Sequence, residues 1–122
     1  MKKRLGRVQL RIMDVLWSKG RANARQITET LAEEEPIAHS TVQTLLRQLE
    51  TKGAVGHQLV DRTFVFHPLI ERSEAARTAT RELVDGVFAG SVGGLVAYLL
   101  KNERIPPEEL HEIRRLIGKM KE

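Results

Sequence analysis

Residues 40–53 carry the hydrophobic pattern from which the rest of the chain can be interpreted. Its apolar residues recur at i, i+3, i+4 and i+7, which is the spacing of one face of an α-helix. They are Val42, Leu45, Leu46 and Leu49. The opposite face is short, hydrogen-bonding and mostly uncharged, with Ser40, Gln43, Thr44, Arg47 and Thr51. Such side chains suit the floor of a DNA major groove, so the pattern predicts a recognition helix that ends at Lys52-Gly53.

A first helix is predicted from about residue 7 to residue 19, ending at Gly20. Met13 and Trp17 widen its apolar stripe, and this tryptophan, the only one in the chain, is expected to be a core anchor. The early basic residues, Arg7 among them, suit either phosphate contacts or a solvated tail. The stripe itself consists of Val8, Ile12, Val15 and Leu16.

A second helix is predicted from residue 23 to about residue 34. Asn23 and Gln26 have the spacing of a capping box. A short connection then leads to the recognition helix, whose N-cap is expected to be Ser40 or His39. Two helices joined in this way, the second with a polar outer face, match the helix-turn-helix plan.

After Gly53 the hydrophobic period changes from 3.6 to 2. The alternation over 55–60 and again over 64–67 predicts two strands, joined by the polar turn 61–63 and ended by Pro68. A hairpin directly after a recognition helix is a wing, so the pattern predicts a winged helix. Arg62 at the tip is expected to contact phosphates or the minor groove, although an exposed arginine in a turn is also commonplace.

Helical spacing returns over 73–88, 92–100 and 107–120, with acids after Pro107 at the start of the last helix. About 50 residues in three helices have little interior to share, yet segment 92–100 is apolar almost all round. We therefore expect this half to pack against its own copy in a homodimer. The residues expected at the dimer interface are Leu83, Val87, Val92, Leu95, Val96, Leu99, Leu100 and Leu116.

These elements give a fold class that is mainly α with a small β-hairpin. We predict an N-terminal winged helix-turn-helix domain over 1–70 and a C-terminal helical dimerisation domain over 71–122. The chain has a formal net charge of +4, and all of the excess lies in residues 1–68, as expected when one half binds a polyanion. The candidate DNA-binding residues are Ser40, Thr41, Gln43, Thr44, Arg47, His39, Arg62 and Arg7.

Composition removes several other functions. Without cysteine, disulfides and thiolate metal sites are excluded, and a cytoplasmic protein is expected. No apolar run approaches the roughly 18 residues that span a bilayer, so no membrane partner is expected. The four histidines have no catalytic or metal-ligand spacing, so we expect no enzyme, no cofactor and no metal. A winged helix used for protein contacts remains as the alternative, although its outer face would be expected to carry large apolar anchors.

The order and spacing of the motifs resemble the penicillinase repressor family, the BlaI, MecI and CopY type. The resemblance spans almost the full length. It implies a dimeric transcriptional repressor that binds a dyad operator over a promoter, often that of its own gene. The motifs that carry it are Ile12-Met13-Asp14-Val15-Leu16-Trp17, Ser40-Thr41-Val42-Gln43-Thr44-Leu45-Leu46 with Leu49 and Lys52-Gly53, Phe64-Val65-Phe66-His67-Pro68-Leu69, Leu95-Val96 and Pro107-Glu108-Glu109-Leu110.

The chain departs from this family at the residues that respond to the inducing signal. Members that respond to β-lactams are cleaved at an Asn-Phe bond, but the matching place here is Tyr98-Leu99. Copper-responsive members use a C-terminal cysteine cluster, which this chain lacks. Gln48 stands where an arginine is common in the family. The resemblance therefore implies the repressor and leaves an upstream sensor or protease as a candidate partner, without identifying the inducer.

Overall fold

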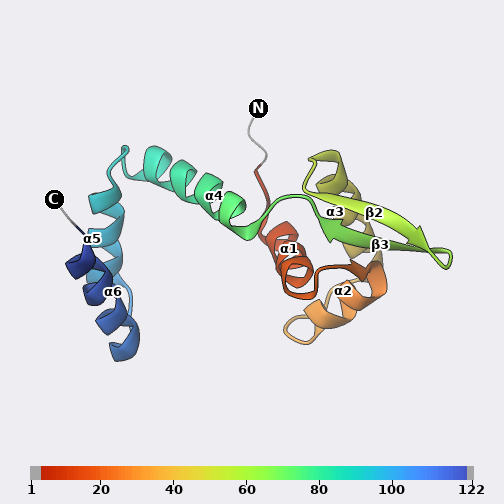
Figure 1. The fold of residues 1–122 in the computed structure, drawn as a ribbon, viewed down its shortest axis with the longest axis horizontal. Coiled ribbons are helices and arrows are strands. Elements are labelled where there is room, and N and C mark those ends of the chain that lie inside the picture. Colours follow the sequence, from red (N-terminus) through yellow and green to blue (C-terminus); the bar gives the residue numbers. More distant parts are fainter. Residues whose placement is uncertain (1–3, 121–122) are drawn as a thin grey trace. The chain divides into compact units, whose positions relative to one another are not determined.

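The computed structural model describes residues 4–120, which form two compact units divided between Ala79 and Thr80 (Figure 1). The division falls inside helix α4 (Arg72–Val87), later than the domain boundary predicted at residue 70. The reason is that the first turn of α4 contacts the first unit. Arg72 forms an ion pair with Asp14 at 2.7 Å, and its guanidinium lies 4.9 Å from the ring centroid of Trp17.

Helix α1 (Arg7–Lys19) forms as predicted and supplies much of the core of the first unit. Ile12, Met13 and Leu16 are fully buried. Gly20 ends the helix with φ of 86°, a left-handed conformation that a residue without a Cβ adopts at little cost. Trp17 packs against this core but is only half-buried, so it lies at the edge of the core and not inside it. Its Nε1 donates to the carbonyl of Ile70 at 2.9 Å.

Helices α2 (Ala24–Ala32) and α3 (His39–Thr51) form the predicted helix-turn-helix. The capping box is confirmed, because the Asn23 side chain accepts from the Gln26 backbone and the Gln26 side chain accepts from the Asn23 backbone, both at 2.8 Å. Helix α2 ends earlier than predicted, and turn structure follows it over 33–35. The inward face of α3 is buried at Val42, Leu46 and Leu49.

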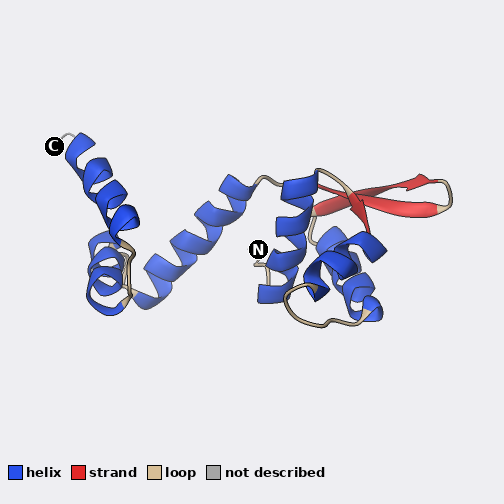
Figure 2. Ribbon diagram, turned by 90° about the horizontal axis from the view of Figure 1, so that it is seen from below, coloured by secondary structure: helices blue, strands red, loops and turns tan. Residues whose placement is uncertain are grey.

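The wing is part of a three-stranded antiparallel sheet in the order β1-β3-β2. Strands β2 (Val55–Val60) and β3 (Thr63–Pro68) pair from Val55 with Pro68 to Val60 with Thr63, as Figure 2 shows for the long hairpin. The predicted three-residue turn is a two-residue turn, since Thr63 belongs to β3. Strand β1 (Ala22–Asn23) was not predicted, because two residues are too short to have a period.

The second unit contains the end of α4, then α5 (Val92–Asn102) and α6 (Pro107–Lys119). Its helix boundaries agree with the predicted segments. Gly90 lies between α4 and α5 with φ of 81°, and Ser91 caps α5 by accepting from the Gly94 backbone at 2.8 Å. The predicted acids, Glu108 and Glu109, lie in the first turn of α6.

Within residues 4–120, no single helix is both long and apolar enough to cross a bilayer. Helices α4 and α5 meet such a test only when taken as one segment, although they are bent by 89° at the break between them.

Candidate nucleic-acid interface

Helix α3 presents the predicted polar face to solvent. Because Val42, Leu46 and Leu49 are held in the core, the residues between them must point outward. Arg47 Nη2 donates to Thr44 Oγ1 at 3.3 Å, so two of the outward side chains are already in contact. The exposed face brings together Ser40, Thr41, Gln43, Thr44 and Arg47.

The start of α3 corrects one prediction. The N-cap is Ala38, not Ser40 or His39, and no side chain caps the helix. The chain turns one residue earlier than expected, because the Thr41 and Val42 amides both donate to the Ala38 carbonyl, at 3.1 and 3.2 Å. Without a side-chain cap, the positive end of the helix dipole is open to an anion from outside.

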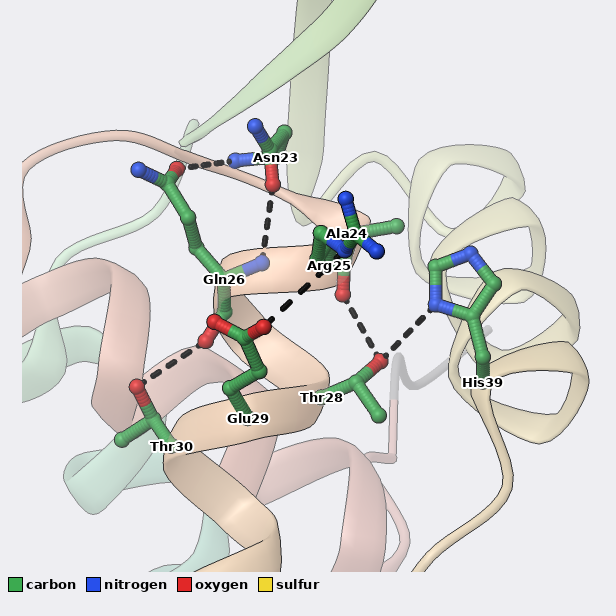
Figure 3. Close-up of polar contacts among 8 residues, drawn as sticks. All are labelled: Asn23, Ala24, Arg25, Gln26, Thr28, Glu29, Thr30 and His39. Atoms are coloured by element: carbon green, nitrogen blue, oxygen red, sulfur yellow. Dashed lines mark hydrogen bonds and ion pairs between the residues drawn. The ribbon is translucent and has the colours of Figure 1, made fainter.

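His39 is held in place by helix α2, as Figure 3 shows. Its Nδ1 lies 3.2 Å from Thr28 Oγ1, and the Thr28 hydroxyl donates its proton to the Ala24 carbonyl at 2.7 Å. A hydroxyl has one proton to donate, so here it must accept from the histidine. This assigns the proton to Nδ1 and leaves Nε2 as the nitrogen for an outside partner.

The tip of the wing places the predicted Arg62 in an unusual turn. Asp61 and Arg62 both have positive φ, 49° and 66°, which is the arrangement of a tight two-residue hairpin turn without a glycine. Arg62 is exposed there. Two side chains near the tip are also exposed although apolar, Leu59 at 67% and Phe64 at 52%.

A contact between the recognition helix and the wing was not predicted. His57 Nδ1 on β2 lies 2.7 Å from Glu50 Oε1 on α3. The same imidazole packs against Phe64, with ring centroids 4.5 Å apart, and against Phe66, at 5.7 Å. The start of the wing is thereby attached to the end of α3. Sequence alone offered the alternation of His57 with apolar residues but no indication of its partner.

The last candidate, Arg7, is exposed at the first residue of α1. The chain just before it is connected to the end of α3, because Lys52 Nζ donates to the Arg4 carbonyl at 2.6 Å. All the candidate DNA-binding residues thus belong to the first unit, on α3, the hairpin tip and the start of α1.

The second unit keeps most of its apolar side chains exposed. Of the residues predicted for a dimer interface, Val87 is 70% exposed, Val92 57% and Leu116 52%, and Leu95 is half-buried. Leu83, Val96, Leu99 and Leu100 are also exposed. Val84, which was not singled out, is the buried residue of α4.

Within the described residues, no three histidine, aspartate or glutamate side chains lie close enough together to hold a metal ion. The resolved pKa shifts belong to residues of the second unit. In α6, the hydrogen bond from Arg115 lowers the pKa of Glu112, and the same bond raises the pKa of Arg115. The candidate residues of the interface are polar side chains, one histidine and arginines.

Comparison with known proteins gives matches along most of the chain. A family model described as penicillinase repressor matches residues 5–119. The penicillinase repressor of Bacillus licheniformis is 26% identical over 113 residues, which are 93% of this chain and 88% of that protein. The methicillin resistance regulatory protein MecI of Staphylococcus aureus (strain N315) is 24% identical over 108 residues, 88% of each chain.

Two solved structures are similar to the chain at 30% sequence identity. The solution structure of the DNA-binding domain of the repressor BlaI has a TM-score of 0.54 and covers 61% of this chain and 93% of that one. The solution structure of monomeric Bacillus licheniformis BlaI in complex with the blaP half-operator has a TM-score of 0.51, with coverages of 58% and 87%.

Proposed function

We propose that this chain, which belongs to the penicillinase repressor family, represses transcription as a dimer bound to a dyad operator. The family consists of transcriptional repressors, and the chain is accordingly a DNA-binding repressor and not an enzyme. The observation that carries the proposal is the outer face of α3. It offers short hydrogen-bonding side chains and an arginine, without the large apolar anchors of a protein-binding surface.

In the proposed complex, α3 lies in the major groove. Gln43 makes a bidentate contact to an adenine, and Arg47 contacts a guanine or the backbone, with Thr41 and Thr44 beside them. The uncapped N-terminus of α3 and the Ser40 side chain bind a phosphate, to which the amides of the first turn donate. His39, the first residue of this helix, keeps its Nε2 for a contact with the DNA, since Thr28 holds the other ring nitrogen.

Outside this helix the proposed contacts are electrostatic. Arg62 at the tip of the wing and Arg7 at the start of α1 contact phosphates of the DNA backbone. Such contacts fix the register of the protein on the duplex and add affinity that falls with salt.

The dimer is supported by the apolar side chains that the second unit leaves exposed. A small unit that leaves many large apolar side chains exposed is expected to bury them in an interface. Two copies related by a two-fold axis would present two α3 helices to two half-sites of an operator. The structure of monomeric BlaI on a half-operator supports the idea that one winged helix occupies one half-site.

An upstream sensor or protease completes the proposal. Tyr98 and Leu99 are exposed, but both lie inside α5. A protease acting at this bond would have to unwind the helix locally, because proteolysis needs extended chain. Release of the operator by cleavage here would therefore depend on how readily α5 opens.

The test is binding of the purified protein to the DNA upstream of its own gene, followed by footprinting, at two salt concentrations. We expect protection of a dyad over the promoter, with half-sites in register with the helical repeat. Affinity should fall steeply with salt, because bound phosphates release counterions. If neither this DNA nor unrelated DNA bound at low salt, the alternative of a protein-contact module would replace the proposal.

A further inference from the structure

Gln9 occupies a position that the helical pattern assigns to an apolar residue. It precedes Ile12, Met13 and Leu16 at the i, i+3, i+4, i+7 spacing of the buried stripe of α1. Gln9 is 6% exposed, and within residues 4–120 it is the one buried polar residue. Burying an amide costs free energy of folding unless its hydrogen bonds are satisfied. The partners of the Gln9 amide therefore indicate its role.

The Gln9 amide joins three parts of the first unit. Its Oε1 accepts from the Gly6 backbone at 2.8 Å and from Lys52 Nζ at 2.9 Å. Its Nε2 donates to Gln48 Oε1 at 2.9 Å. Lys52 in turn donates to the Arg4 carbonyl at 2.6 Å. The segment before α1 is therefore attached to the last turn of α3 through the Gln9 amide. Its hydrogen bonds to Gly6, Gln48 and Lys52 together form an amide relay between residues far apart in the chain.

These attachment points lie on the DNA-facing helix itself. Ser40, Thr44, Gln48 and Lys52 follow one another at i+4 spacing, so they form one ridge along α3. The start of that ridge belongs to the proposed groove contacts, and its end holds the segment 4–6. The ammonium of Lys52 is directed to protein acceptors, so its charge serves this attachment.

The attached segment carries positive charges at the N-terminus of α1, where the helix dipole favours negative ones. The first turn of α1 holds no acid, and Arg7 stands at its first residue, near the positive end of the helix dipole. Arg4 and Arg7 are both exposed. Cations at this end of a helix lower its stability slightly, and a phosphate beside them would reverse the effect.

We propose that Gln9 is a positioning residue for DNA binding, which holds the segment 4–7 beside α3 so that Arg4 and Arg7 contact the DNA backbone. This rests on the proposed function, since it adds a second contacting segment to the same interface. The side chain must be polar at both of its contacts, because it accepts from Gly6 and Lys52 and forms a hydrogen bond with Gln48 on α3.

The experiment replaces Gln9 by leucine, which suits the apolar stripe but removes the relay. Gln9 is uncharged and buried, so any change in salt dependence must come from cations elsewhere. We expect the slope of log affinity against log salt to become shallower by about 1 to 2 per protomer. Binding is measured by anisotropy on a labelled duplex of the upstream DNA and on a scrambled duplex of equal length, both of which should show the change.

Two variants serve as controls. Gln9→Glu keeps the acceptors for Gly6 and Lys52, and the Gln48 amide can turn to donate to it, so it should retain the wild-type slope. In a chain carrying Arg4→Ala and Arg7→Ala, Gln9→Leu should change the slope no further. If Gln9→Leu does not fold, Gln48→Ala removes the exposed end of the relay and should shift the slope in the same direction.

Each outcome separates the positioning role from the proposed function. If the wild-type protein binds neither duplex, the proposed function fails. If the wild-type protein binds and Gln9→Leu, folded by circular dichroism, keeps its slope, the positioning role alone is wrong. A steeper slope would mean that the released Lys52 had become a phosphate contact. A further change of slope when Gln9→Leu is added to Arg4→Ala and Arg7→Ala would mean that other cations are responsible. Either result would overturn the proposal.

Discussion

The two units of this repressor use the same kind of hydrophobic stripe to opposite effect. In the first unit the stripes of α1, α2 and α3 meet in one cluster that includes Ile12, Ile27 and Leu46, all at most 1% exposed. In the second unit, α5 and α6 have no buried residue by the same measure, and Val87 and Ile117 are 70% and 56% exposed. A helical stripe therefore shows that a face needs a partner, but not whether the same chain provides it.

The largest expected effect comes from breaking the core of the first unit. Leu46→Ala should lower the free energy of unfolding by about 2–5 kcal/mol, because it removes a fully enclosed side chain and leaves a cavity. Denaturant unfolding followed by fluorescence of Trp17, which lies in the first unit, measures this directly.

The matched control is Leu100→Ala, the same chemical change on an exposed side chain of the second unit. It should alter the unfolding of the first unit by less than about 0.5 kcal/mol. Equal losses for the two variants would contradict the contrast between the units.

The next effect concerns the exposed stripe of the second unit. Leu99→Arg should dissociate the proposed dimer, because a charge would be buried at the interface. Affinity for a duplex with two half-sites should then fall roughly 100-fold or more, with little change on a single half-site. Sedimentation and anisotropy measure the two properties.

Asn102→Arg adds the same charge to α5 outside the apolar set and should leave both properties near wild type. A Leu99→Arg protein that remained dimeric would place the interface on other residues.

Within the first unit, Gln43→Ala should affect recognition and leave the fold unchanged, since Gln43 is exposed. We expect a loss of about 1–3 kcal/mol per half-site, confined to one base position. Binding to a set of duplexes substituted at each position measures it, with Ser18→Ala at an exposed position of α1 as the control. A uniform loss on all duplexes would rule out the base contact.

The smallest effect tests the attachment of His39 to α2. Thr28→Val keeps the shape of the side chain but removes the hydroxyl that fixes the imidazole, so DNA affinity should fall by about two- to tenfold.

Thr30→Val is a close control, because the Thr30 hydroxyl also donates to a carbonyl one turn earlier, that of Gln26 at 2.9 Å, but holds no histidine (Figure 3). Equal effects of the two variants on affinity would show that the loss comes from the helix and not from His39.

Sequence by itself determined the features that depend on near neighbours in the chain. The stripe of α3, the capping box of Asn23 and Gln26, the glycine that ends α1 and the alternation of β2 and β3 all follow from local periodicity and capping chemistry. The polar face of α3 was predictable for the same reason, because the side that is buried fixes the side that is not.

Tertiary structure decided the features that join distant residues. Strand β1 exists because Ala22 and Asn23 meet Phe66 and Val65, and the Glu50–His57 contact attaches α3 to the wing. In the sequence Gln9 was only a polar residue in an apolar stripe. Its partners, Gln48 and Lys52, lie 39 and 43 residues away, and a spacing rule cannot pair side chains that are brought together only when α1 packs beside α3.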